Sequence, residues 1–179
     1  MIKDPDNPSL YFLQWTGMTV SGKPLAGVSI SQYQSTPTII DSGTVISRIP
    51  VNIYEPLRDA FVKAMSTRYP KAPSYSILDT CYYTKPRKTA MTNGRKKEGT
   101  MKILIGVPEV SMIFQGGAEL KLRPQNVLIE LENGVSCLAY AANYATNGLA
   151  IIGNTQQKTF RILYDVTNSK IGFAAGGCE

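Results

Sequence analysis

Short runs of apolar and β-branched residues, each ended by a turn signal, recur along most of this sequence. Runs of this length and composition, bounded by Gly, Asn or Pro, are typical of β-strands. The run at 11–20 leads into a turn at 21–24 and predicts a hairpin, and Asn133-Gly134 predicts another. Further strands are expected at 38–40, 110–114, 120–122, 127–131, 135–141, 149–152, 160–164 and 170–174. The sequence therefore predicts an all-β fold built from short strands.

One segment departs from the strand pattern and predicts one main α-helix at about 52–67. Asn52 can cap the start of this helix, and Glu55 stands three residues later, at the spacing of a capping box. The helix should end before Pro70. Its apolar face, at helical spacing, consists of Tyr54, Leu57, Phe61 and Met65. A short helical turn is also expected after Gly153.

Histidine is absent from all 179 residues, and this excludes several kinds of catalytic site within this chain. Ser-His-Asp catalysis, Cys-His catalysis and histidine-based zinc sites all need an imidazole. Acid-base chemistry would therefore use carboxylates, Lys, Tyr or Cys. No apolar run reaches the length of about 18 residues that a membrane helix needs, so we expect no membrane span. We also expect no cofactor and no metal.

The net charge of +6 is concentrated between Lys85 and Lys102. Seven of the 19 basic residues and one of the 13 acidic residues lie there, so the rest of the chain is neutral overall. A solvated loop is the favoured interpretation of such a run. Phosphate binding is the alternative, but the segment contains no aromatic residue on which a nucleic-acid base could stack.

The tetrapeptide Asp41-Ser42-Gly43-Thr44 lies between two short β-prone runs, the second at 45–46. Tetrapeptides of this composition are common in ordinary turns, but two flanking strands would hold this one in place. Asp41 supplies a carboxylate, and Gly43 lets the backbone approach closely because it has no Cβ. Ser42 and Thr44 add short hydroxyls that can hydrogen-bond neighbouring groups. We therefore interpret Asp41 as a candidate catalytic residue.

Several longer blocks accompany this loop in a consistent order. They lie at 38–50, 54–61, 78–82, 107–111, 150–157, 164–166 and 171–174. Together they resemble the second lobe of plant pepsin-like aspartic proteases of the nepenthesin and chloroplast-nucleoid-DNA-binding type. The resemblance covers nearly the whole chain, and the block that contains Ile151-Ile152-Gly153 is the most family-like part.

The resemblance implies that residues 1–179 form the C-terminal lobe of an all-β pepsin-like acid protease, with the N-terminal lobe absent. It implies an aspartic-type endopeptidase that cleaves polypeptides with an aspartate-activated water, and Asp41 would be one of its two aspartates. Two adjacent carboxylates share one proton, so one acts as acid and the other as base. Ile151, Ile152 and Gly153 would support the loop in a psi-shaped arrangement. A single lobe is expected to be inactive.

The three cysteines are Cys81, Cys137 and Cys178. The resemblance implies a disulfide between Cys81 and Cys137, and it leaves Cys178 to pair with the absent lobe. Free, buried cysteines are the alternative. A disulfide favours an extracellular, vacuolar or other lumenal location, because such compartments are oxidising. A chloroplast location is the alternative that the resemblance leaves open.

Two other functions remain alternatives. The first is a non-catalytic binding protein, which resembles the plant xylanase-inhibitor branch of the family. The second is DNA binding through the basic insertion at about 85–102, where the chain departs from the family pattern. An intact Asp41-Ser42-Gly43-Thr44 favours the protease over the binding protein, because a purely binding descendant has no chemical need for that loop.

Overall fold

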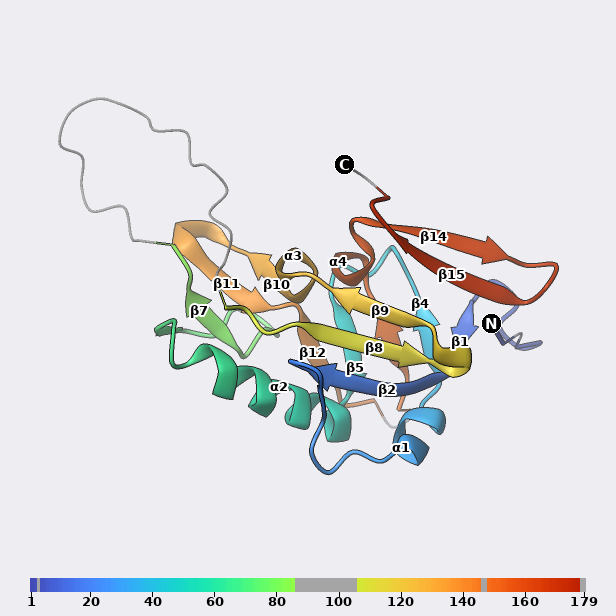
Figure 1. The fold of residues 1–179 in the computed structure, drawn as a ribbon, viewed down its shortest axis with the longest axis horizontal. Coiled ribbons are helices and arrows are strands. Elements are labelled where there is room, and N and C mark those ends of the chain that lie inside the picture. Colours follow the sequence, from blue (N-terminus) through green and yellow to red (C-terminus); the bar gives the residue numbers. More distant parts are fainter. Residues whose placement is uncertain (3, 86–105, 146–147, 178–179) are drawn as a thin grey trace.

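The computed structural model describes residues 1–2, 4–85, 106–145 and 148–177. Within these residues the chain forms four β-sheets and a few helices, so the predicted all-β fold is confirmed. Figure 1 shows the main helix, α2 (Val51–Met65), and a hairpin formed by β14 (Phe160–Asp165) and β15 (Lys170–Ala175) on opposite sides of the other strands. Most of the basic segment lies outside the described residues, which end at Lys85 on its amino-terminal side.

The central sheet joins segments from both ends of the chain. In spatial order its strands are β1 (Phe12–Leu13), β4 (Thr38–Ile40), β13 (Ala150–Ile152), β5 (Ser47–Pro50) and β12 (Tyr140–Asn143). Strand β13 lies between β4 and β5, with Ile151 opposite both Ile39 of β4 and Arg48 of β5. It runs parallel to β4 and antiparallel to β5. The loop 41–46 that connects β4 with β5 must therefore cross the end of β13.

Two four-stranded sheets pack with the central one. The first contains, in order, β3 (Lys23–Pro24), β2 (Trp15–Val20), β8 (Val110–Phe114) and β9 (Glu119–Leu122). The second contains β10 (Leu128–Glu130), β11 (Val135–Leu138), β7 (Cys81–Tyr83) and β6 (Lys71–Ala72). The predicted Asn133-Gly134 hairpin is confirmed, because β10 and β11 pair antiparallel across a turn with φ of 58° and 75° at these two residues.

Helix α2 confirms the predicted apolar face, since Tyr54, Leu57, Phe61 and Met65 are all buried. The predicted cap at Asn52 is wrong. The helix begins at Val51, and its N-cap is Pro50, which makes no side-chain cap hydrogen bond. Strand β5 runs through Pro50 directly into the helix, so Asn52 already has helical surroundings and cannot act as the extended capping residue. The helix ends at Met65, two residues before the predicted end.

The remaining helices are short: α1 (Ile30–Gln34), α3 (Pro124–Val127), α4 (Asn154–Gln157) and the 3₁₀ turns Gln115–Gly117 and Glu132–Gly134. The predicted turn after Gly153 is confirmed by α4. Helix α1 was not predicted, although Ser29 and Gln32 form a capping box at its start. It is held by Tyr33, whose ring lies 4.8 Å from the ring of Trp15.

Predictions for two strands and one turn need correction. Residues 45–46 do not resume a strand, because they still belong to the loop that crosses β13, and β5 starts at Ser47. The run 127–131 opens with the end of α3, which Pro124 starts by standing at its first position. The turn of the first hairpin is confined to Ser21-Gly22, and the next two residues form β3.

One large apolar core lies between the sheets and α2. Its largest fully buried side chains are Trp15, Tyr54, Tyr82, Tyr140 and Phe61. A smaller cluster surrounds Cys81 and Cys137 and includes Ile46, the last residue of the loop between β4 and β5. In the part of the chain that the structure describes, no helix is long and apolar enough to cross a membrane.

The packing of α2 leads to a prediction. Replacing the fully buried Phe61 with Ala should reduce the free energy of unfolding by about 3–5 kcal/mol, because the substitution leaves a cavity in the core. Urea unfolding followed by circular dichroism would measure the change. Lys63→Ala, at an exposed position of the same helix, should change it by no more than about 0.5 kcal/mol. Equal losses in the two variants would contradict the packing described.

Candidate active site

Asp41 directly follows β4, at the point where the chain leaves the central sheet. Its backbone amide donates a hydrogen bond to the carbonyl of Ile152 at 3.0 Å, so the end of β13 holds it in place. One carboxylate oxygen, Oδ1, accepts from the Gly43 amide at 2.8 Å. The other, Oδ2, accepts from the Thr44 hydroxyl at 2.6 Å. Both oxygens of this half-buried carboxylate are therefore oriented by its own loop.

These two donors stabilise the ionised form of Asp41. The Thr44 hydroxyl, and next the Gly43 amide, lower the pKa of Asp41 below its ordinary value of 3.8, while partial burial opposes them. A Cβ at residue 43 would lie 3.1 Å from Oδ1, closer than most Cβ contacts, which explains the glycine there. Ser42 is exposed, and its hydroxyl has no hydrogen bond to any described residue.

The far side of the loop rests on β13 and α4. A Cβ on Gly153 would lie only 2.5 Å from the carbonyl carbon of Ile46, so only glycine allows this approach of the two backbones. At the start of α4, the Asn154 amide donates to the Thr44 carbonyl at 2.6 Å. The Thr155 amide and hydroxyl both donate to the Val45 carbonyl, at 2.9 and 2.8 Å. Residues 151–153 thus lie directly against the loop that carries Asp41.

No second carboxylate of the described residues faces Asp41. Asp79 instead accepts hydrogen bonds from Tyr54 and Thr80, beside the second four-stranded sheet. Asp165 accepts hydrogen bonds from Asn168 in the turn between β14 and β15. Within the described part of the chain, the oriented carboxylate of Asp41 therefore lacks the second carboxylate that a shared proton would need.

An exposed aromatic pair lies near this carboxylate, and the sequence analysis did not identify it. The Tyr11 carbonyl accepts a hydrogen bond from the Ile40 amide at 3.3 Å, which places Tyr11 beside the residue that precedes Asp41. The rings of Tyr11 and Tyr164 lie 4.8 Å apart. Burial, the neighbouring Tyr11 and the charge of Asp41 raise the pKa of Tyr164. No sequence signal pairs these residues, because only the hairpin position brings them together.

A disulfide bond joins Cys81 of β7 to Cys137 of β11, which is the pair that the family resemblance implies. The two residues stand opposite each other in neighbouring strands, so the bond ties the sheet across a sequence separation of 56. Cys178 lies outside the described residues. Among the residues that the structure describes, no cluster of three or more His, Cys, Asp or Glu could hold a metal ion.

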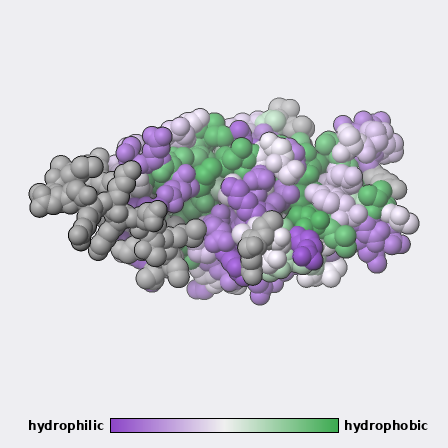
Figure 2. Space-filling model, turned by 90° about the horizontal axis from the view of Figure 1, so that it is seen from above, coloured by the Kyte–Doolittle hydropathy of each residue, from purple (hydrophilic) through white to green (hydrophobic). Residues whose placement is uncertain are grey.

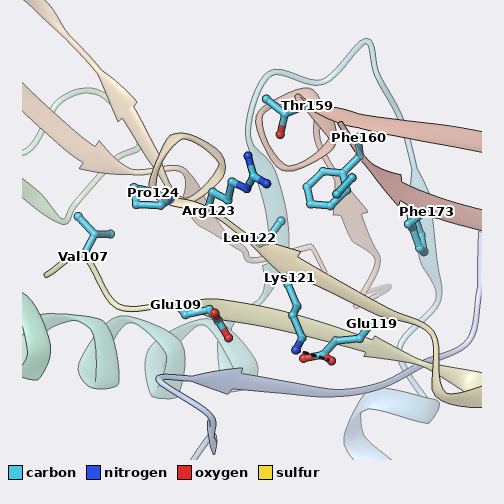
Figure 3. A pocket seen from close by; sticks show the side chains of 11 residues that line it. Val107, Glu109, Glu119, Lys121, Leu122, Arg123, Pro124, Thr159, Phe160 and Phe173 are labelled. Atoms are coloured by element: carbon cyan, nitrogen blue, oxygen red, sulfur yellow. Dashed lines mark ion pairs between the residues drawn. The ribbon is translucent and has the colours of Figure 1, made fainter. Parts of the chain in front are cut away.

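A separate cavity of about 590 Å³ lies between β9, α3 and the hairpin. Figure 3 shows the Arg123 side chain directed toward Thr159 and Phe160, while Lys121 pairs with Glu119 at 3.6 Å on the other side. None of the residues 41–44 lines this cavity. Its charged lining contains two acidic and two basic side chains, so it offers no clear preference for an anion or a cation.

Comparison with known proteins decides the family. Residues 10–175 match the family described as xylanase inhibitor C-terminal. An aspartyl protease family protein of Arabidopsis thaliana is 34% identical over 174 residues, which cover 97% of this chain and 33% of that protein. Nepenthesin-2 of Nepenthes gracilis is 33% identical over 177 residues, which cover 96% of this chain and 36% of that protein. The chain belongs to the plant pepsin-like aspartic protease family, as a C-terminal lobe.

Solved structures show the same fold for this pepsin-like lobe. EDGP superposes with a TM-score of 0.74 at 17% identity, over 94% of this chain and 40% of that one. Conglutin gamma, described as a basic 7S globulin from lupine seeds, superposes with a TM-score of 0.71 at 18% identity, over 96% and 38% of the two chains. The lobe spans about a third of the length of the protease relatives that it matches.

The Thr44 hydrogen bond gives a prediction about pH. Thr44→Val should raise the pKa of Asp41 toward 3.8, because the largest stabiliser of its ionised form is lost. A depressed folded pKa adds stability above the unfolded pKa, and this stability disappears as pH falls through the folded value. The variant should therefore be less stable than the unmodified lobe at neutral pH. At a pH below both the folded and the unfolded pKa of Asp41, the two should be equally stable. Carbon-13 NMR titration of the Asp41 carboxyl would measure the shift.

Thr44→Ser is the control for this titration, since it keeps the hydroxyl and should keep most of the lowered pKa. An Asp41 pKa that stays the same in Thr44→Val would contradict the geometry described.

The contact of Gly153 with Ile46 gives another prediction. Gly153→Ala should reduce the free energy of unfolding by about 1–3 kcal/mol or more, because the new Cβ meets backbone that cannot turn away. The φ of Gly153 is −81°, so the contact and not the conformation causes the loss. Gly17→Ala is a matched control, since its Cβ would meet Ile113 at an ordinary 3.7 Å. Urea unfolding would compare them, and equal stabilities would refute the contact.

Proposed function

We propose that this lobe belongs to an aspartic-type endopeptidase and supplies Asp41 as one of two catalytic aspartates. The observation that carries the proposal is the orientation of Asp41, whose two oxygens each accept one hydrogen bond from its own loop. The protease names of the relatives support the same reaction class. The substrate would be a polypeptide, and the attacking nucleophile a water activated by carboxylate.

The lowered pKa of Asp41 suggests which part of the shared-proton chemistry it performs. Two carboxylates in contact cannot both ionise easily, so one of them keeps a proton. Thr44 and Gly43 favour the ionised form of Asp41. In the proposed mechanism Asp41 therefore accepts the proton of the water, while the partner aspartate donates its proton to the peptide carbonyl. Each role needs a separate group at the moment of attack.

The partner aspartate would come from the N-terminal lobe of the same protease. The hairpin β14–β15 supports this proposal, because among the described strands each of its two strands pairs only with the other. Unpaired strand edges are ready to accept another strand. Leu163, Tyr164 and Val166 of the hairpin region are exposed. Figure 2 shows hydrophobic residues, in green, at the surface of the molecule seen from above. A single lobe would be inactive.

The same proposal predicts the bonding partner of Cys178 and the cellular location of the protein. Cys178 would bond to the N-terminal lobe, because Cys81 and Cys137 already pair with each other. An extracellular, vacuolar or other lumenal location fits a protein with a disulfide, since reducing compartments keep thiols free.

A non-catalytic binding role is the second candidate. It is favoured by the description of the matching family as a xylanase inhibitor and of one structural neighbour as a seed globulin. The two candidates differ in what they require of Asp41, because only the protease needs its carboxylate. DNA binding through the segment 85–102 has no support from the described residues, since most of that segment lies outside them.

Activity of the two-lobed protein tests the protease proposal. The lobe joined to its natural first lobe should cleave a protein substrate at acid pH, and pepstatin should inhibit the cleavage. Asp41→Asn should reduce kcat by at least about 10²- to 10⁴-fold, the contribution of a positioned acid or base. Asp59→Asn, on the exposed face of α2, should keep full activity. Absence of acid peptidase activity in the unmodified two-lobed protein would favour the binding role.

A further inference from the structure

Gln156 of α4 has a completely buried side chain whose amide makes every hydrogen bond it can form. Its Oε1 accepts from the Ser47 hydroxyl at 2.6 Å and from the Ser47 amide at 3.1 Å. Its Nε2 donates to the carbonyls of Asn126 at 2.8 Å and Ala139 at 3.1 Å. A primary amide has two donors and two acceptor lone pairs, so its capacity is filled. Gln156 thereby joins β5, α3 and the residue between β11 and β12.

Ser47 is the residue on which the loop from Asp41 ends. Its Oγ donates to Gln156 and also accepts from the Gly153 amide at 3.0 Å. Gln156 and the Gly153 amide therefore both hold Ser47, the first residue of β5, beside the end of β13. The same short helix α4 holds the carbonyls of Thr44 and Val45 through its first two amides. The carbonyls of Thr44 and Val45 and the hydroxyl of Ser47 are therefore all held by residues of α4.

A second buried amide holds α4 from its other end. Asn126 donates through Nδ2 to the carbonyls of Thr155 at 3.1 Å and Lys158 at 2.6 Å. Its own backbone carbonyl accepts from Gln156. Asn126 and Gln156 are each fully buried. These reciprocal bonds lock α3 against α4, and they give the helix under the loop one defined position.

We propose that Gln156 is a positioning residue for Asp41. Gln156 fixes Ser47 and α4, and these in turn fix the Thr44 hydroxyl that binds the Asp41 carboxylate. The proposal rests on the proposed catalytic role of Asp41. The contacts give a reason for the glutamine itself. A carboxylate there would face the carbonyls of Asn126 and Ala139 without a donor. An apolar side chain would remove all four hydrogen bonds and leave the Ser47 amide with only its 3.3 Å bond to the Ala139 carbonyl. Only a primary amide of this length satisfies both sides.

The first test uses this chain alone and does not depend on catalysis. Gln156→Met keeps the length of the side chain and removes its hydrogen bonds. The Asp41 pKa, measured by carbon-13 NMR, should rise toward 3.8, because the Thr44 hydroxyl is no longer held on Oδ2. Ser136→Ala is the control. Ser136 lies in β11, outside the central sheet, and the substitution removes its buried hydroxyl, which bonds to Thr84. It should destabilise the fold and leave the Asp41 pKa unchanged.

Ser47→Ala provides a milder second variant, which decides the question if Gln156→Met does not fold. It removes only the hydroxyl that links Gln156 to Gly153, and it should shift the Asp41 pKa in the same direction. An unchanged pKa in a folded Gln156→Met or Ser47→Ala variant would overturn the proposal. An equal shift in Ser136→Ala would also overturn it, because general destabilisation would then explain the result.

The second test uses the two-lobed protein. Gln156→Met should lower kcat by about 100-fold, as expected when a catalytic group is misplaced by about 1 Å, and leave KM nearly unchanged. A full kcat with a shifted Asp41 pKa would show that the displacement has no catalytic consequence and would overturn the proposal. If the unmodified two-lobed protein has no activity, the proposed function fails, while the pKa measurements still report on how Gln156 holds Asp41.

Discussion

The close approach of Gly153 to the backbone of Ile46 is the constraint on which the rest of the site depends. A Cβ at that point would lie 2.5 Å from a backbone atom, so the position of β13 between β4 and β5 requires a residue without one. Because β13 occupies that place, the amide of Asp41 can reach the carbonyl of Ile152. The end of β13 then holds the loop at Asp41, and α4 holds it at Thr44 and Val45, so the carboxylate has one defined orientation.

Under the proposed mechanism, this orientation gives Asp41 only one of the two roles that the reaction needs. A carboxylate with a donor on each oxygen is stabilised as an anion, and a shared-proton pair needs a second group that keeps its proton. The described residues place no such group near Asp41. The hairpin β14–β15 is incomplete in a similar way, since a two-stranded sheet has limited stability by itself and here exposes apolar side chains. Both features are consistent with a lobe that functions against another lobe.

The predictions from the sequence succeeded where the signal was local. Apolar residues spaced three or four positions apart identified the buried face of α2, and Asn133-Gly134 identified the hairpin of β10 and β11. They failed where tertiary packing changed a local preference. Asn52 is a good capping residue, but β5 continues into the helix before it can cap. Residues 45–46 are β-prone, yet they must cross β13 and remain in a loop. Helix α1 carried a valid capping box that was too short a signal to distinguish from a turn.

The sequence by itself determined the chemistry inside the loop. Asp41, Gly43 and Thr44 are within three positions of one another, so the sequence itself supplies the carboxylate and the two donors that it binds. Only the tertiary structure decided what holds that loop. The hydrogen bonds that Ser47 donates to Gln156 join residues 109 positions apart. A glutamine in a polar stretch predicts no partner, because a partner at that separation exists only after the sheet order has brought α4 under β5.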